Sequence, residues 1–160
     1  MTADFWIQKL NLQPHPEGGY YKETYRCKQL IKTEGFEGSR NISTAIYFLL
    51  DGSNKSHFHR IKSDELWFFH EGAALEVLLL NEGRLEIITL GKNLDLGETL
   101  QAAVPAGCWF GARLKDEKSY TLVSCTVAPG FDFRDFELAR KEELKKIYPA
   151  HLQIIDEMCL

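Results

Sequence analysis

The sequence predicts an all-β barrel or sandwich with short helices at both ends, and three observations support this. Between residues 20 and 127, short apolar and aromatic runs recur at near-regular spacing, separated by turn residues. Residues 2–10 and 136–158 instead have the apolar spacing of helices. The 160 residues contain no internal repeat or linker-like stretch. One domain is therefore predicted over 1–160, with its barrel at about 18–135 and C-terminal helices at about 136–158.

The predicted elements follow in order along the chain. The first helix covers residues 2–10, and the PHPEGG turn at 14–19 leads into the first strand. Residues 28–41 are polar and contain glycine, which predicts a loop. A three-residue hairpin loop that ends at Gly83 joins two of the strands. The predicted strands are 20–26, 43–50, an extended piece at 57–59, 65–70, 75–80, 84–90, 99–104, 108–114 and 120–127.

The C-terminal tail has a different pattern. Residues 136–147 place apolar side chains at helical spacing with paired charges between them. Asp135 is the predicted N-cap of this helix, and Pro149 ends it. A last short helix is expected at roughly 150–158.

Composition and charge exclude several classes of partner. The net charge is −4 and there is no basic run, so no nucleic-acid partner is expected. The first residues lack a basic segment followed by an apolar one, and no stretch approaches the ~18 apolar residues of a membrane helix. We therefore expect no membrane partner and a cytoplasmic protein. The four cysteines are far apart in sequence and are expected to be reduced thiols.

A short histidine motif is the sharpest chemical feature. His57 and His59 are two residues apart, so in an extended strand both face the same side. Glu65 begins a later strand in which Trp67 and Phe69 share its face, and an antiparallel return could bring Glu65 beside the two histidines. Two imidazoles and one carboxylate are a ligand set for a divalent metal. Without metal, the same groups form a general acid/base pair.

The spacing around this motif resembles that of cupins. Gly52-x4-His57-x-His59-x5-Glu65-x6-Gly72 is similar to the first cupin motif, although two spacings differ from the usual pattern by one residue. Gly97, Pro105 and Gly107 resemble the second motif, in which a third histidine ligand normally follows. In this chain Phe110 occupies that position, so the resemblance implies a metal site that lacks its third histidine.

Longer segments resemble one family, the fifth cupin domain family, formerly a domain of unknown function. They are PHPEGGYYKETYR, SHFHRIKSDELWFFHEG, VPAGCWF and TLVSCTVAPGFDFRDFELA. The resemblance implies a double-stranded β-helix, the jelly-roll-like cupin barrel, usually as a homodimer, with a small-molecule pocket whose ligand is uncertain. The family also resembles sugar-nucleotide epimerases in fold. This analogy favours a carbohydrate- or nucleotide-like ligand, although fold alone does not determine function.

Several other side chains have both a functional and a structural interpretation. Tyr47 is either a general acid that reaches into the barrel or a packing residue with its hydroxyl at the rim. Trp67, Phe69 and Phe110 either contact a ligand or fill the core. Arg113 either clamps an anionic group or is exposed.

Two further histidine positions complete the candidates. In the turn at 14–20, His15 and Glu17 either reach a site or belong to an arm that packs across the dimer. His70 faces away from Glu65 by strand alternation and is left out of the site.

Two functions follow from these candidates. An enzyme would either use Fe, Mn, Ni or Zn bound by His57, His59 and Glu65, or work without metal. In the metal-free form, His57 or His59 removes a proton next to a carbonyl, and Tyr47 or Glu65 returns one. The alternative is a non-catalytic module that binds a small metabolite between apolar walls.

Overall fold

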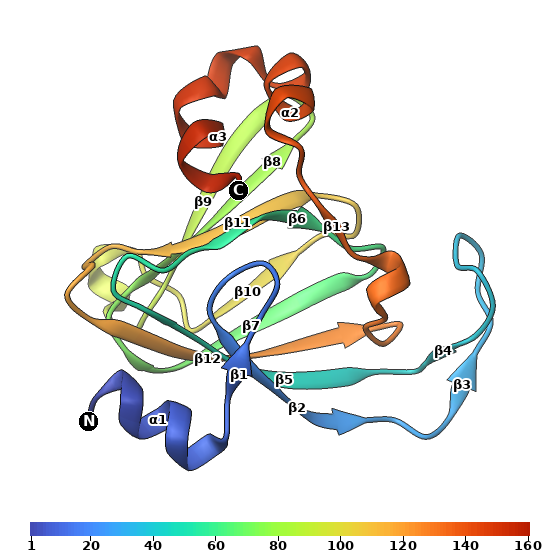
Figure 1. The fold of residues 1–160 in the computed structure, drawn as a ribbon, viewed down its shortest axis with the longest axis horizontal. Coiled ribbons are helices and arrows are strands. Elements are labelled where there is room, and N and C mark those ends of the chain that lie inside the picture. The colour runs from blue at the N-terminus through green and yellow to red at the C-terminus, as the bar shows by residue number, and fades with distance from the viewer.

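The computed structural model describes all 160 residues, and they form two antiparallel sheets that enclose a common core (Figure 1). The first sheet has six strands in the order β1 (Gln13–Pro14), β2 (Tyr20–Arg26), β5 (Thr44–Asp51), β12 (Tyr120–Ala128), β7 (Asp64–Gly72) and β10 (Gln101–Val104). The second has five strands in the order β13 (Glu137–Leu138), β6 (Ser56–Arg60), β11 (Trp109–Leu114), β8 (Leu75–Asn81) and β9 (Arg84–Leu90). The predicted all-β barrel is confirmed.

Strand alternation places one face of each sheet in the core. Phe48, Trp67 and Val123 come from the six-stranded sheet, and Val77 and Phe110 come from the five-stranded sheet. All of them belong to one cluster of 17 buried residues. Burying this much apolar surface is the main source of stability for a barrel of this size.

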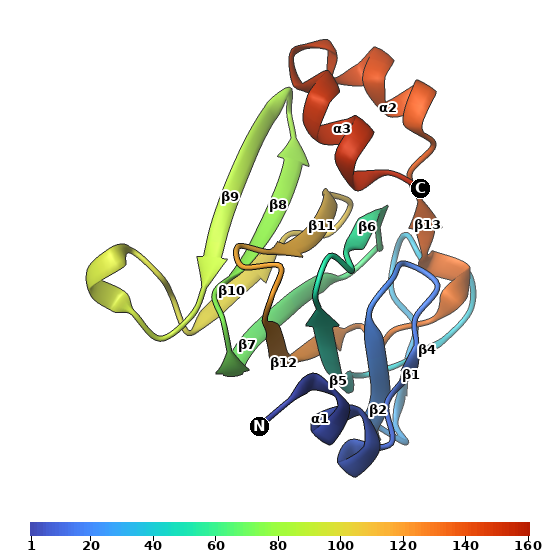
Figure 2. The same ribbon diagram turned by 60° about the vertical axis from the view of Figure 1, so that its left-hand side comes forward.

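Helices cover the outer faces of both sheets (Figures 1 and 2). Helix α1 (Ala3–Leu10) packs on the six-stranded sheet near Leu49 and Leu122, and the Thr2 side chain caps its N-terminus. Helices α2 (Lys141–Ile147) and α3 (Leu152–Met158) pack on the five-stranded sheet. The remaining helical turns, all of 3-10 type, are η1 (Leu94–Leu96), η2 (Phe133–Asp135) and η3 (Pro149–His151). None of the helices is long and apolar enough to cross a membrane.

The structure corrects the predicted start of the C-terminal helix. Helix α2 begins only at Lys141, and Asp135 does not cap it. Glu137 and Leu138 instead form β13, which pairs with β6, and the Ala139 amide donates to the carbonyl of Phe58. The local charge pattern favours a helix over 136–147, but an open edge of β6 offers this segment backbone partners from elsewhere in the chain.

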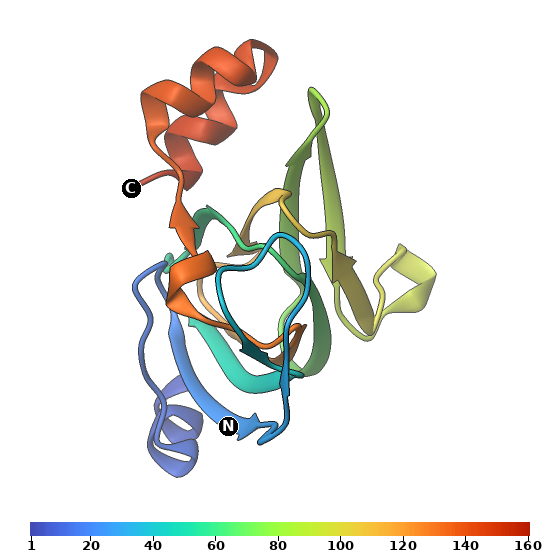
Figure 3. The same ribbon diagram turned by 90° about the vertical axis from the view of Figure 1, so that its right-hand side faces the viewer.

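Two turn regions also differ from the prediction. The hairpin between β8 and β9 has a two-residue loop, because Asn81 still pairs with Arg84, and Glu82 and Gly83 both have positive φ. The expected loop at 28–41 contains two short strands, β3 (Leu30–Ile31) and β4 (Arg40–Asn41), which pair with each other. Figure 3 shows this hairpin at one end of the barrel, beside the turn of η2.

Candidate functional site

A cavity of about 420 Å³ lies between the two sheets, large enough for a small metabolite. Four strands of the six-stranded sheet and the 15–17 and 131–133 segments contribute to its wall, and β6 contributes from the other sheet. Titratable and aromatic side chains are both frequent on this wall. The lining residues are His15, Glu17, Tyr21, Glu23, Arg26, Thr44, Ile46, His59, Ile61, Glu65, Cys125, Val127, Phe131, Asp132 and Phe133.

The N-terminal turn brings Glu17 into the cavity. The Glu17 carbonyl accepts hydrogen bonds from the backbone amide of His57 at 2.8 Å and from its ring Nδ1 at 2.7 Å. These bonds attach the turn to β6. Gly18 follows with φ +107°, and a Cβ there would lie 1.9 Å from the carbonyl oxygen of Lys55. Glycine is therefore required for this close approach.

The Glu17 carboxylate and the His59 imidazole form a buried pair. Oε2 of Glu17 lies 2.9 Å from Nε2 of His59, and the Ser56 hydroxyl donates to Oε1 at 2.8 Å. Burial raises the pKa of Glu17, but the charge and hydrogen bond of His59 outweigh it, and the net pKa is lowered. For His59, burial lowers the pKa, but the Glu17 carboxylate outweighs it and the net pKa is raised.

The hydrogen bonds of His59 fix where its protons lie. Its Nδ1 lies 2.8 Å from the carbonyl oxygen of His57, and a carbonyl only accepts, so Nδ1 carries a hydrogen. The contact from Nε2 to Glu17 then needs a second proton between imidazole and carboxylate. The opposite pKa directions place it on His59, as an imidazolium paired with a carboxylate.

His15 stands beside this pair in the neutral form. Its Nδ1 accepts a hydrogen bond from the Glu17 backbone amide at 3.2 Å, so the ring hydrogen is on Nε2. Burial lowers the pKa of His15 and outweighs the opposing charge of Glu17. His15 can therefore donate a hydrogen bond to a bound molecule without carrying charge.

Glu65 enters the cavity from β7, in the sheet opposite that of His59. Its pKa is raised, whereas that of Glu17 is lowered. Its side chain is 7% exposed and no hydrogen bond to a cationic group reaches it. Burial and the negative charge of Glu17 raise its pKa to about 7, although His59 acts against them. The nearby Cys125 thiol, whose own pKa burial and Glu65 raise, stays protonated. Glu65 therefore changes its protonation state near neutral pH.

A β-bulge in β2 shapes the mouth of the cavity. The register between β2 and β5 shifts between Glu23 and Tyr25, so Arg26 recovers the inward face while Tyr25 is 53% exposed. The Arg26 guanidinium donates to both carboxylate oxygens of Glu23, to the Asn41 side chain and to the Phe131 carbonyl.

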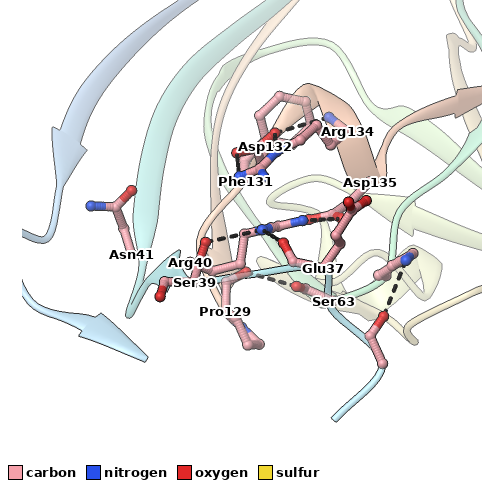
Figure 4. Close-up of polar contacts among 12 residues, drawn as sticks. Glu37, Ser39, Arg40, Asn41, Ser63, Pro129, Phe131, Asp132, Arg134 and Asp135 are labelled. Carbon is pink, nitrogen blue, oxygen red and sulfur yellow. Dashed lines mark hydrogen bonds and ion pairs between the residues drawn. The ribbon is translucent and has the colours of Figure 1, made fainter. Parts of the chain in front are cut away.

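A buried ion pair braces the wall formed by residues 131–133 (Figure 4). Arg40 is 2% exposed and donates two hydrogen bonds to Asp135, at 2.7 and 2.8 Å, as well as bonds to the carbonyls of Glu37 and Ser39. The bidentate pair connects β4 to the η2 turn. This contact holds the two segments at the end of the barrel in one arrangement.

The structure places the predicted catalytic residues in three different locations. His59 and Glu65 line the same cavity. His57 does not line it, because its ring is turned toward the Glu17 carbonyl. Tyr47 lies on the outer face of the six-stranded sheet, close to His70 and the α1 side. His70 hydrogen-bonds to Ser124 on that face, as its exclusion from the site anticipated.

The predicted ligand-binding residues lie around the cavity or away from it. Trp67 and Phe110 belong to the core cluster, Phe69 is partly buried against it, and none of the three lines the cavity. Phe110 packs against the His59 ring with centroids 4.1 Å apart, and the Trp67 indole nitrogen is buried without a hydrogen-bond partner. Arg113 pairs with Glu76 and Glu157 on the outer face, so it joins β11 to β8 and α3.

The predicted metal ligands are not gathered into a metal site. Strands β6 and β7 belong to different sheets, so the expected antiparallel pairing that would place Glu65 beside both histidines does not occur. Both ring nitrogens of His59 are occupied by protein groups, and His57 is turned away. No group of three or more His, Cys, Asp or Glu side chains is arranged to hold a metal ion. The residues present do not fit the metal that the cupin motif implies.

Most of the cavity-lining residues that the sequence does not identify lie on β2, β5, β12 and the 131–133 segment. A usable signal was present for Tyr21 and Glu23, since they share one face of a predicted strand. No local signal identifies Arg26, because the bulge that turns it inward has no sequence marker. His15 and Glu17, which the sequence left as either site residues or part of a dimer arm, both line the cavity.

Known proteins resemble this chain in sequence and in overall fold. The sequence model of a family described as cupin superfamily (DUF985) matches residues 4–139. An uncharacterized protein of Saccharomyces cerevisiae, YML079W, is 32% identical over 155 residues, which cover 88% of this chain and 77% of the yeast protein.

Solved structures extend the comparison. A hypothetical protein from Leishmania major is 38% identical, with a TM-score of 0.92 over 99% of both chains. Protein SO0799 from Shewanella oneidensis is 40% identical, with a TM-score of 0.91 over 100% of this chain and 98% of the other. Oxalate decarboxylase from Bacillus subtilis is 16% identical, with a TM-score of 0.55 over 91% of this chain and 36% of the enzyme, which shows a shared fold only.

Proposed function

Because the chain belongs to the DUF985 family of the cupin superfamily, we propose that it binds a small polar metabolite in the barrel cavity and catalyses a metal-free proton transfer on it. One observation carries the proposal. Glu17 and Glu65 line the same cavity, and their surroundings move their pKa values in opposite directions. A carboxyl whose pKa lies near neutral pH can act as a base, and the His59 imidazolium that ionised Glu17 stabilises can act as an acid.

The proposed roles follow from these protonation states. Ionised Glu65 takes a proton from a carbon next to a carbonyl, and the electron pair of the broken C–H bond moves into the carbonyl to form an enolate. The proton that His59 shares with Glu17 is then donated to the other face of that carbon. Glu65 and His59 come from opposing sheets, which favours transfer on two faces and hence epimerisation of a carbohydrate-like ligand.

Solvent exchange tests the proposal. The protein is incubated in deuterated water with a panel of free sugars and keto-sugar nucleotides, and deuterium next to the carbonyl is followed by NMR. We expect exchange that falls about 100-fold in His59→Gln. His70→Gln, which changes a histidine outside the cavity, should retain it. Absence of exchange with every compound would contradict the proposal.

A second candidate is a non-catalytic binding module. It is favoured by the fact that both ring nitrogens of His59 already have protein partners. Such a module would show ligand-dependent shifts of the unfolding midpoint without any exchange of substrate protons.

For the assembled state we propose a homodimer. The support is the family resemblance alone. The cavity described above is formed by a single chain and does not itself require a partner. Light scattering in solution measures the mass directly, and a mass near 18.4 kDa at micromolar concentration would contradict the dimer.

A further inference from the structure

The charged groups around the cavity are matched in pairs, with one exception. Glu17 pairs with His59, Glu23 with Arg26, and Asp132 with Arg134 outside the cavity. The fourth carboxyl on the wall, Glu65, has no cationic partner. Glu65 is deeply buried, and its hydrogen-bonding neighbour is the neutral Cys125 thiol. The His59 imidazolium acts on it through its charge and not through an ion-pair contact.

The cations on the wall are already in use. Four of the five N–H donors of Arg26 go to protein oxygens. Both ring nitrogens of His59 are likewise engaged, and His15 is neutral. A carboxylate or phosphate group that entered the cavity would therefore meet no free cation, and it would face an unpaired carboxyl.

Aromatic side chains complete the surroundings. Tyr21, Phe131 and Phe133 line the cavity, and Phe131 and Phe133 meet edge to face with centroids 4.9 Å apart. The faces of such rings attract organic cations. An unpaired buried carboxyl and aromatic walls are both features that stabilise an ammonium group.

We propose that the ligand carries a protonated amine, which binds Glu65 inside the cavity, and that the cavity rejects an anionic group at this position. An ammonium would give one carboxylate oxygen of Glu65 the charge-assisted hydrogen bond that no protein group supplies, and the other oxygen stays available to take a proton. The inference rests on the proposed function only in requiring that a small molecule occupies the cavity. It restricts a carbohydrate-like ligand to an amino sugar or a similar amine, with any phosphate outside the cavity.

Three probes on one three-carbon scaffold test the preference. They are 3-amino-1,2-propanediol, glycerol and glycerate, which place an ammonium, a hydroxyl or a carboxylate at the same position. Binding to the full chain is measured by NMR titration at about pH 8, above the pKa of about 7 of Glu65. We expect the amine to bind about tenfold more tightly than glycerol, and glycerate to bind most weakly.

Two variants locate the preference. In Glu65→Gln the advantage of the amine over glycerol should disappear, and Glu71→Gln, an exposed change on the same strand, should keep it. The backbone amide spectrum shows whether each variant remains folded. The proposal is overturned by an amine that fails to bind, by glycerate binding as well as the amine, or by an amine preference that persists in Glu65→Gln.

The outcome is independent of catalysis. An amine preference without deuterium exchange would retain this inference and leave a binding module. Deuterium exchange on a neutral or anionic compound without an amine preference would retain the proton transfer and overturn the ligand class.

Discussion

The carboxylate Oε2 of Glu17 lies 2.9 Å from Nε2 of His59, although Glu17 comes from the turn between β1 and β2 of the six-stranded sheet and His59 from β6 of the five-stranded sheet. Their pKa values move apart because each stabilises the charged form of the other. This pair is the electrostatic centre of the cavity, and the first prediction concerns it.

Replacing Glu17 with glutamine should lower the pKa of His59. The carboxylate charge and its hydrogen bond hold that pKa up against burial, and an amide removes the charge. The His59 ring signals followed by NMR across the pH range measure the change. Ser56→Ala, which removes only the other hydrogen bond to Glu17, is the control and should change it less. An unaltered His59 titration in Glu17→Gln would contradict the ion pair.

Glu65 should make the protein less stable as the pH rises. Its folded pKa of about 7 lies above the ordinary value of 4.5, so between these values the folded protein holds a proton that the unfolded chain has released. Stability from this group is complete below about pH 4.5 and is lost as the pH rises through about 7. As the pH rises between these limits, the free energy of unfolding of Glu65→Gln should therefore increase relative to that of the wild type by up to about 3 kcal/mol. Urea unfolding at both ends measures it, with Glu71→Gln expected to show no such gain.

Removing one partner of the buried Arg40–Asp135 pair should be strongly destabilising. Arg40→Met leaves the Asp135 carboxylate buried without its cation, which costs about 3–5 kcal/mol. The double change Arg40→Met/Asp135→Leu should recover much of this loss, since neither charge remains. Chemical unfolding of the two variants compares them. Equal stability of the single and double variants would show that the pair itself carries little of the effect.

A side chain at Gly18 should displace the turn that carries Glu17. Gly18→Ala would place a Cβ 1.9 Å from the Lys55 carbonyl, so the turn must move away from β6. We expect a loss of about 2 kcal/mol or more and a lowered His59 pKa. Gly35→Ala is the matched control, because its φ is also positive but a Cβ there has no neighbour within 4 Å. An unchanged His59 titration in Gly18→Ala would show that the conformation of this turn does not position Glu17 against His59.

Tyr47→Phe should leave both binding and proton exchange unchanged. The hydroxyl of this residue belongs to the outer face of the six-stranded sheet, which the cavity does not reach. The deuterium-exchange assay measures the effect against the wild type. A large loss of exchange would show that Tyr47 reaches the ligand and acts as the general acid that the sequence allows.

Most of the longer strands and two residues of the cavity wall could be predicted from the sequence. The resemblance to the second cupin motif places Phe110 inward, and Phe110 lies in the core with Trp109 on the outer face. Alternation places Glu65 on the face of Trp67 and Phe69, and Glu65 lines the cavity together with His59. The same rule fails at Arg26, because the extra residue of the bulge reverses the alternation. It also fails for residues 136–140, where pairing with β6 replaces helical propensity.

The sequence by itself determined most of the longer strands and the apolar side of each, because these follow from a local two-residue period. Only the tertiary structure decided that β6 and β7 belong to opposite sheets and that the 14–19 turn delivers Glu17 to His59. Such contacts depend on where distant segments meet after the apolar faces are buried. His59 and Glu65 were therefore candidates from the sequence, but the contact with Glu17 that protonates His59 became visible only in the folded chain.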